Sequence, residues 1–413
     1  MQRYDSYKDS GVKWLGEIPS HWEVKPIKRI AQTFAGATPN SNNEKYWGGS
    51  IAWVTPADFK TETKYVNGGK RFLTELGLNS CSTVIVPRDS VIFSKRAPVG
   101  QISIATQPLC TNQGCISCVP FDTVDSTFLY YLLSLYKETF ESFSGGTTFK
   151  EISQQSFNDF SISLPPLIEQ EAIANYLDTA TSKIDEAIAQ QQKMIDLLNE
   201  RKQIIINNAV TKGLDPNVKM KPSGIDWIGD IPEHWKKRRM RYLCKITTGN
   251  KDTINRVDDG LYPFYVRSPK VERINSYSYD GEAVLMAGDG VGAGKVFHYV
   301  NGKFDYHQRV YCFYEIEMIK AKLLYYYMQN LFKYVIEQLS AKSTVDSVRL
   351  NMIQDFVVCI PSIKEQIEMV NFIDKEIANI EKAIQISLKQ ISLLQERKQI
   401  IINDVVTGKV KVI

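Results

Sequence analysis

The chain has 413 residues, of which 43% are hydrophobic and 23% charged, and its formal net charge at pH 7 is +4. These values describe an ordinary soluble globular protein of two to four domains. No apolar run approaches the roughly 20 residues of a membrane span, and residues 1–5 lack the apolar core of a signal peptide, so neither a membrane protein nor a secreted protein is expected. We therefore expect a cytoplasmic protein with no membrane partner.

Two blocks of the sequence occur twice. Residues 11–22 return in closely similar form as residues 224–235, a displacement of 213 positions, and residues 200–207 return unchanged as residues 396–403, a displacement of 196. The chain is therefore a tandem of two similar halves, and the parts that differ lie between the repeated blocks. The change from 213 to 196 makes the second intervening region 17 residues shorter than the first.

The intervening regions are predicted to mix strands and helices. The predicted strands are residues 82–86, 90–93 and 101–104, and the predicted helices are residues 127–133 and 321–328. Two further short matches link the regions: Pro98–Gly100 with Gly290–Gly292, and Asn112-Gln113 with His307-Gln308. We expect the two regions to share a fold and to carry divergent surfaces.

Each half ends in a long predicted helix. The first begins after Pro165-Pro166 and ends near residue 213, because prolines suit a helix start and glycine a helix end. Residues at alternating spacings of four and three form an apolar stripe of the coiled-coil type in both helices. The apolar stripe positions are Ile184, Ile188, Ile195, Leu198 and Ile205 in the first helix and Ile380, Ile384, Ile391, Leu394 and Ile401 in the second.

The stripe is interrupted at the same two places in each helix, by Gln191 and Lys202 in the first and by Ser387 and Lys398 in the second. Polar residues at such positions lower stability and can fix register and orientation. An antiparallel pair of the two helices is the favoured arrangement. The alternative is that each helix packs separately on its own globular domain.

Three of the seven cysteines lie close together, and Cys115 and Cys118 have the C-x-x-C spacing. A structural zinc site needs four ligands, and no second pair of cysteines or histidines supplies the rest. The alternative to zinc is a set of small buried strand residues, and we expect reduced thiols and no metal site.

Catalytic motifs are missing from the sequence. The glycine-rich run at residues 288–295 resembles a phosphate-binding loop, but Asp289 occupies the position of its first glycine and Val296 that of the magnesium-binding hydroxyl. A tight β-turn explains this run better. His21 and His234 occupy the same repeat position beside tryptophan, which indicates packing more than catalysis.

The remaining signals suit nucleic-acid binding. Basic residues near predicted turns, two corresponding loops rich in small and hydroxyl residues, and a basic stretch at residues 236–245 are typical of phosphate and base contacts. For each residue alone, a solvated surface position is the competing interpretation. The candidates are Lys64, Lys70, Arg71, Lys95, Arg96, Gly146, Thr147, Thr148, Lys150, Lys236, Arg238, Arg267, Arg273, Lys295, Lys342, Ser343 and Thr344.

Over its whole length the chain resembles the specificity subunit of type I restriction-modification systems. The resemblance rests on the Trp-x-Gly-x-Ile-Pro-x-His-Trp leads at residues 14–22 and 227–235, on the Pro-Pro-Leu-Ile-Glu-Gln-Glu segment at 165–171, and on the Leu-Leu-x-Glu-Arg-Lys-Gln segments at 197–203 and 393–399. Residues 36–53 resemble a common class of target recognition domain. The second half departs from the pattern by having one proline fewer at residues 361–362 and no Tyr-Trp-Gly-Gly stretch.

The resemblance implies a mixed α/β fold in which two target recognition domains are separated by an antiparallel pair of coiled-coil helices, with pseudo-two-fold symmetry. The implied divisions are a first recognition domain with its lead at 1–165, a first helix at 166–213, a second recognition domain with its lead at 214–360 and a second helix at 361–413. Each recognition domain would read one half of a bipartite site in double-stranded DNA, and the helices would set the spacing.

The resemblance also implies the partners. Two methyltransferase subunits would dock on the helices, and restriction subunits of the helicase-nuclease type would join them. S-adenosylmethionine, ATP and Mg²⁺ would act in those partners, and this chain would be non-catalytic and hold no cofactor. Two alternatives remain at this stage: a coiled-coil scaffold whose variable domains bind proteins, and a stand-alone enzyme.

Overall fold

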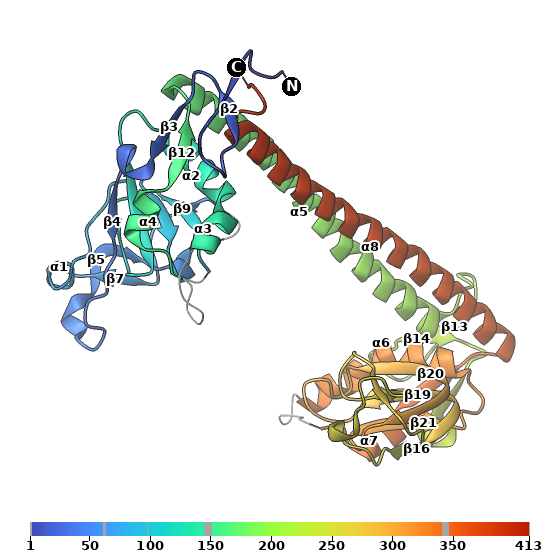
Figure 1. Ribbon diagram of the computed structural model, residues 1–413. Coiled ribbons are helices and arrows are strands. Elements are labelled where there is room, and N and C mark those ends of the chain that lie inside the picture. The colour runs from blue at the N-terminus through green and yellow to red at the C-terminus, as the bar shows by residue number, and fades with distance from the viewer. Residues whose placement is uncertain (1, 61–62, 97, 144–150, 341–346, 413) are drawn as a thin grey trace. The chain divides into compact units, whose positions relative to one another are not determined.

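A computed structural model describes residues 2–60, 63–96, 98–143, 151–340 and 347–412. The chain forms two compact units, and each contains one mixed α/β domain together with part of both long helices (Figure 1). These domains correspond to the recognition domains expected from the sequence, and we use that name for them. Unit 1 comprises Met1–Gln190 and Gln390–Ile413, and unit 2 comprises Gln191–Lys389. No helix in the described part of the chain has the length and apolar character needed to cross a membrane.

The described residues of unit 1 form twelve strands in four small sheets. Their orders are β1-β2, β12-β3, β10-β5-β7 and β4-β11-β8-β9-β6. The strands are β1 (Tyr7–Asp9), β2 (Glu17–Pro19), β3 (Glu23–Pro26), β4 (Ala31–Ala35), β5 (Trp47–Val54), β6 (Tyr65–Val66), β7 (Arg71–Leu73), β8 (Val91–Ser94), β9 (Ile102–Ala105), β10 (Cys110–Thr111), β11 (Cys115–Pro120) and β12 (Ser161–Leu164). The helices before the long one are α1 (Glu75–Asn79), α2 (Ser126–Leu135), α3 (Lys137–Phe143) and α4 (Gln154–Asn158), with short 3-10 turns at Ile27–Arg29, Glu44–Tyr46 and Pro56–Asp58.

The described residues of unit 2 have a similar arrangement, with three sheets in place of four. Its sheets have the orders β13-β14, β15-β22 and β16-β21-β19-β20-β17-β18. The strands are β13 (Met220–Pro222), β14 (Asp230–Pro232), β15 (Lys236–Arg239), β16 (Lys245–Thr248), β17 (Tyr262–Tyr265), β18 (Glu272–Ile274), β19 (Tyr279–Ala287), β20 (Phe297–Tyr306), β21 (Val310–Tyr314) and β22 (Val357–Ile360). The helices are α6 (Ala321–Ser340) and α7 (Leu350–Gln354), with 3-10 turns at Met240–Tyr242 and Thr253–Asn255.

The two recognition domains have related strand topologies. Both contain an antiparallel run of four strands, β4-β11-β8-β9 in unit 1 and β16-β21-β19-β20 in unit 2. In unit 2 this run continues in the same sheet into the parallel pair of β20 with β17, whereas in unit 1 the parallel pair of β10 with β5 belongs to a separate sheet and the run itself ends on β6. The expected fold class, two mixed α/β domains combined with paired long helices, is confirmed. One predicted element is wrong: residues 82–86 form no strand, because the Thr83 hydroxyl bonds to both backbone groups of Thr111 while Val84 and Ile85 remain exposed.

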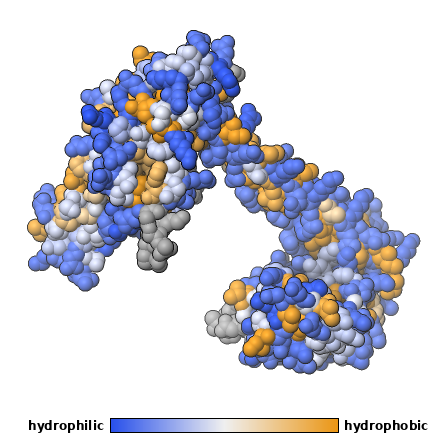
Figure 2. All heavy atoms as spheres, in the orientation of Figure 1, coloured by the Kyte–Doolittle hydropathy of each residue, from blue (hydrophilic) through white to orange (hydrophobic). Residues whose placement is uncertain are grey.

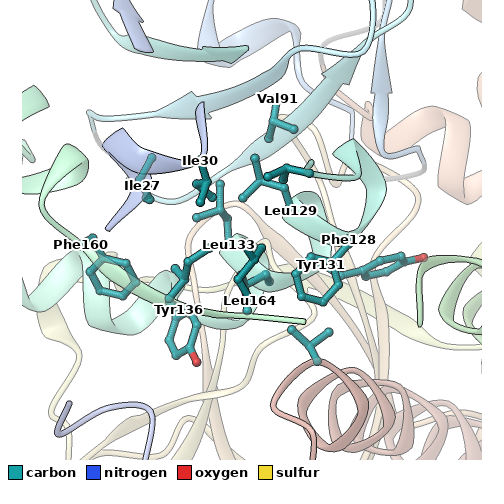
Figure 3. Close-up of a cluster of buried hydrophobic side chains, with 14 of the residues drawn as sticks. Ile27, Ile30, Val91, Phe128, Leu129, Tyr131, Leu133, Tyr136, Phe160 and Leu164 are labelled. Atoms are coloured by element: carbon teal, nitrogen blue, oxygen red, sulfur yellow. The ribbon is translucent and has the colours of Figure 1, made fainter. Parts of the chain in front are cut away.

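The largest sheet of each unit packs against a helix, α2 in unit 1 and α6 in unit 2. In unit 1, residues of α2 such as Phe128, Leu129 and Leu133 pack with Ile27, Ile30 and Val91 in the larger core (Figure 3). A smaller cluster that includes Ile92 and Cys115 lies on the opposite face. Burial of such apolar side chains, at roughly 25 cal/mol per Å², stabilises this arrangement.

The long helices are α5 (Leu167–Lys212) and α8 (Ile363–Val406). In unit 1, Ile173 and Leu177 share a core with Ile402 and Val406, while Asp185 bonds to Lys398, so α8 runs antiparallel to α5. In unit 2 the same direction follows from two contacts. Ile206 and Val210 share a core with Met369 and Ile373, and Lys202 pairs with Glu381. All fourteen stripe positions, the four polar ones included, are buried or half-buried, and nearly every residue between them is exposed.

The leads are held on the helices by equivalent contacts in both units, made by a glutamate at the start of each long helix. Glu169 accepts a hydrogen bond from Trp22 and lies 2.9 Å from His21 Nε2, and Glu365 has the equivalent contacts with Trp235 and His234. This explains the repeated His-Trp pairs as packing elements. The two long helices begin differently. Helix α5 begins directly after Pro166, whereas α8 follows Ser362, which exchanges hydrogen bonds with Glu365 and so caps the helix in place of the missing proline.

A second pair of anchors is formed by two fully buried glutamines. Gln170 accepts from the backbone of Asp125 and donates to the carbonyls of Thr123 and Pro165. Gln366 accepts from the backbone of Lys320 and donates to those of Met318 and Pro361. We call α5, α8 and the two leads the helical frame, and these contacts fix each recognition domain on it.

Candidate nucleic-acid interface

One turn has the same backbone hydrogen bonds in both recognition domains. In unit 2 it joins β20 to β21 at His307–Arg309, and in unit 1 it joins β10 to β11 at Asn112–Gly114. The first residue donates its backbone N–H to the end of the parallel partner strand, Tyr265 in unit 2 and Val54 in unit 1. We call these two segments the platform turns.

The side chain of the first residue closes each platform turn. His307 Nδ1 accepts from the backbone N–H of Arg309 at 2.9 Å, and Asn112 Oδ1 accepts from that of Gly114 at 2.9 Å. The third residue then accepts from the neighbouring strand end, from Gly288 in unit 2 and from Lys95 in unit 1, at 2.8 Å in both. A histidine and an asparagine therefore perform one structural task, which explains why they correspond in the sequence.

In unit 2 the platform turn carries two exposed polar side chains, Gln308 and Arg309. Asp289 lies beside it, 3.5 Å from Arg309 Nε and 3.0 Å from Arg267 Nη1. The carboxylate thus holds two guanidinium groups in place. Arg267 was predicted from the sequence as a DNA contact, whereas Arg309 was not.

In unit 1 the same edge carries a different charge arrangement. Lys95 and Arg96, from the loop after β8, both pair with Glu151 at 2.9 Å. Burial alone would raise the pKa of Glu151, but hydrogen bonds from Lys95 and Arg96 lower it below 4.5. Lys95 is only 15% exposed, so its charge is largely taken up by this pair, while Arg96 is 47% exposed.

The β5-β7 hairpin of unit 1 forms a second polar and aromatic surface. The guanidinium of Arg71 lies 3.3 Å from the centre of the Trp47 ring, and Trp53 packs edge-on against Trp47. Lys70 is exposed next to this stack. Unit 2 lacks the Tyr-Trp-Gly-Gly stretch and presents Tyr262 and Tyr277 on the corresponding hairpin side.

Two predicted DNA contacts, Lys64 and Arg273, form bonds within the protein. Lys64 is 14% exposed and pairs with Asp178 of α5, which also accepts from the hydroxyl of Tyr131. Arg273 donates to the backbone carbonyls of Gly260 and Leu261. Lys64 is therefore held by an ion pair and exposed Arg273 by backbone hydrogen bonds, and both stay predicted contacts.

The basic stretch after the second lead lies on β15, which pairs with β22. Arg239 and Arg241 both bind Asp355, a contact that unit 1 repeats between Lys28 and Asp159. Lys236 and Arg238 are exposed and form no ion pair with the residues described, and the same holds for Lys295. Arg239 and Arg241 in this stretch therefore hold the protein's own structure, whereas Lys236 and Arg238 are exposed to a binding partner.

The two hydroxyl-rich loops fall outside the described residues. This applies to Gly146, Thr147, Thr148, Lys150, Lys342, Ser343 and Thr344. The described neighbours of both loops lie beside the platform turns, since Glu151 bridges to Arg96 and Ser347 to Asp289. We call each platform turn, together with the bridged residue Arg96 or Asp289 beside it, the platform edge. The sequence match between Asn112-Gln113 and His307-Gln308 was the signal that points to this edge.

The structure assigns the cysteines to packing. Cys115 and Cys118 lie three residues apart on β11, so they face opposite sides of the sheet and belong to different cores. Burial raises the pKa of both thiols. Within residues 2–412, apart from the undescribed segments, no three His, Cys, Asp or Glu side chains gather to hold a metal ion. The run at 288–295 forms turns between β19 and β20, as expected.

A duplicated mixed α/β domain mounted on paired long helices, with polar edges that differ between the copies, defines a two-domain recognition protein. The model of the type I restriction modification DNA specificity domain matches residues 19–195 and 232–390, more than half of the chain. The chain belongs to this family, as its sequence motifs predict.

Known proteins agree with this assignment. The chain is 33% identical over 240 residues to the type I restriction enzyme MjaIX specificity subunit of Methanocaldococcus jannaschii, covering 57% of this chain and 54% of that one. It thus spans about half the length of this relative. A second relative from that organism, the MjaVIII specificity subunit, is 22% identical and covers 98% of this chain and 97% of its own.

A solved structure shows the same fold. It comes from work on complex assembly and conformational transition of the type I R-M system, with a TM-score of 0.74 at 15% identity, covering 95% of this chain and 99% of that one.

Proposed function

We propose that this chain is the DNA-sequence specificity subunit of a type I restriction-modification complex and works in the cytoplasm. Each recognition domain reads one half of a bipartite site in double-stranded DNA, and the helical frame sets the distance between the halves. One observation carries the proposal: the frame contacts are duplicated, whereas the side chains on the equivalent platform edges differ. Two domains with the same framework and different exposed side chains suit the recognition of two different DNA sequences.

The frame also offers two equivalent docking faces. Leu197 and Ile204 on α5 are 50% and 52% exposed, and Leu393 and Ile400 at the equivalent positions of α8 are 53% and 51% exposed. Figure 2 displays apolar residues among polar ones along the helices. Exposed apolar side chains that repeat at i and i+7 suit a protein partner. We propose that each face binds one methyltransferase subunit.

The chemistry belongs to the partners in this proposal. Methyl transfer from S-adenosylmethionine to adenine requires the base to be flipped out of the duplex into a separate active site. ATP and Mg²⁺ serve the restriction subunits. The specificity chain contributes recognition and geometry and is non-catalytic.

The test is a domain exchange. Residues 22–164 are replaced by the equivalent segment of another specificity subunit, and methylated adenines are located by sequencing DNA modified by the assembled complex. One half of the methylated site should change and the other should stay. The reciprocal exchange of residues 235–360 is the matched control and should change the other half. A change in both halves after either exchange would refute modular recognition.

A further inference from the structure

We propose that the platform turns are base-reading elements and that Arg309 reads a guanine in the half-site of the second recognition domain. Gln113 and Gln308 occupy the equivalent reading position in the two domains. This inference rests on the proposed function and assigns its sequence readout to particular side chains.

The first argument is rigidity. Every backbone N–H from His307 to Val310 is hydrogen-bonded: to Tyr265, to Lys251, to the His307 ring and to His307 itself. A side chain on such a fixed backbone loses little conformational freedom when it binds. Precise placement of donors is what hydrogen-bond readout of base edges requires.

The second argument is side-chain chemistry. Arg309 is 63% exposed, and its Nε faces Asp289, so this carboxylate orients the guanidinium. Its terminal nitrogens bond to no described residue. An arginine oriented in this way can donate two parallel hydrogen bonds to O6 and N7 of guanine. The neighbouring Gln308 donates its Nε2 to Asp252 Oδ2 at 2.6 Å, so Arg309 carries the free donors of this turn.

The third argument is the difference between the copies. Gly114 stands at the position of Arg309, and basic Arg96 stands at that of acidic Asp289. The hydrogen bonds made by the first and third residues of the turn, and by the residue that follows it, are nevertheless the same. A retained scaffold with exchanged functional side chains is expected where two domains read different sequences.

A phosphate contact is the competing role for Arg309, and two substitutions distinguish it. Arg309→Lys keeps the positive charge and loses the planar fork, while Arg309→Ala removes both. Arg239→Ala is the matched control, because Arg239 shares the carboxylate of Asp355 with Arg241 just as Arg309 shares Asp289 with Arg267.

The experiment selects duplexes from a pool with randomised positions, using the purified full-length chain, and sequences the bound fraction. Both Arg309 variants should lose preference for guanine at one position of one half-site, by roughly 10- to 100-fold, and leave the other half-site intact. Arg239→Ala should keep the wild-type motif.

Two other outcomes are informative. If Arg309→Lys retains the full motif, or if both Arg309 variants weaken binding equally for all sequences, Arg309 is a phosphate contact and the inference is wrong while the proposed function stands. If the wild-type chain enriches no bipartite motif, the proposed function itself fails.

Discussion

The helical frame and the recognition domains differ in what their two copies have in common. In the frame, the same residue types make the same bonds twice: Glu169 and Glu365, Gln170 and Gln366, and the pairs Lys398–Asp185 and Lys202–Glu381. In the recognition domains, the backbone is retained and the exposed side chains are exchanged. Positions that hold the frame therefore tolerate little change, whereas positions on the platform edge are free to diverge.

The largest effect is expected at the buried glutamines of the frame. Gln366→Leu leaves two carbonyls and one N–H of the backbone without partners, at a cost of about 3 kcal/mol or more, because each unpaired buried group costs roughly 1–3 kcal/mol. Urea unfolding monitored by circular dichroism measures this loss. The exposed Gln395→Ala on the same helix should change stability by less than about 0.5 kcal/mol. Equal effects of the two substitutions would contradict the anchoring role.

A second effect is expected at an aspartate of each long helix, which binds a tyrosine and a lysine; the lysine comes from a different place in the sequence in each unit. Asp178 of unit 1 binds Tyr131 and Lys64, whereas Asp374 of unit 2 binds Tyr326 and Lys322. Lys322 lies one helical turn before Tyr326, and Thr127 occupies that position relative to Tyr131. Lys64→Ala should destabilise unit 1 by about 2 kcal/mol, because it removes a charged partner from Asp178 and Tyr131.

Thr127→Lys should restore most of that loss in the Lys64→Ala background, since it recreates the arrangement of unit 2. Thermal unfolding of the single and double variants measures the recovery. A Thr127→Met variant of similar length serves as the control. If methionine rescues as well as lysine, packing rather than the ion pair explains the anchor.

A smaller effect is expected at the two ion pairs between the long helices. Lys398 Nζ lies 2.7 Å from Asp185, and Lys202 Nζ lies 2.8 Å from Glu381, with both carboxylates more than half exposed. Double-mutant cycles to alanine should give similar coupling energies for the two pairs, in the range of about 0.2–1 kcal/mol. If only one of the two pairs shows a coupling energy, the two halves of the frame are not energetically equivalent.

The smallest effect is a pH dependence at the second lead. Burial would raise the pKa of Glu365, but hydrogen bonds from His234, Ser362 and Trp235 lower it below 4.5. A carboxylate with a depressed folded pKa stabilises the protein above about pH 4.5, and this contribution is lost as pH falls through the folded value. Glu365→Gln should therefore reduce the acid-induced loss of stability, by less than about 1 kcal/mol.

Unfolding free energies measured between pH ~6 and ~3.5 test this prediction. Glu396→Gln, an exposed substitution on the same helix, should retain the wild-type pH profile. If the unfolding free energy of Glu365→Gln depends on pH as that of the wild type does, Glu365 does not contribute to the loss of stability in acid.

The sequence alone determined the duplication, the two long helices and their stripe. These features depend on local periodicity and on proline and glycine signals, which the chain displays directly. The sequence also identified the family, through motifs that lie in the frame. It placed Asn112-Gln113 opposite His307-Gln308 without revealing why they correspond.

Tertiary structure decided which cations are free. Lys64 and Lys95 pair with carboxylates 114 and 56 residues away, and no local pattern predicts such partners. It also showed that residues 82–86 form no strand, because a distant threonine backbone captures the Thr83 hydroxyl. The platform turns could not be predicted from the sequence, because they are defined by hydrogen bonds between segments that lie far apart in the chain.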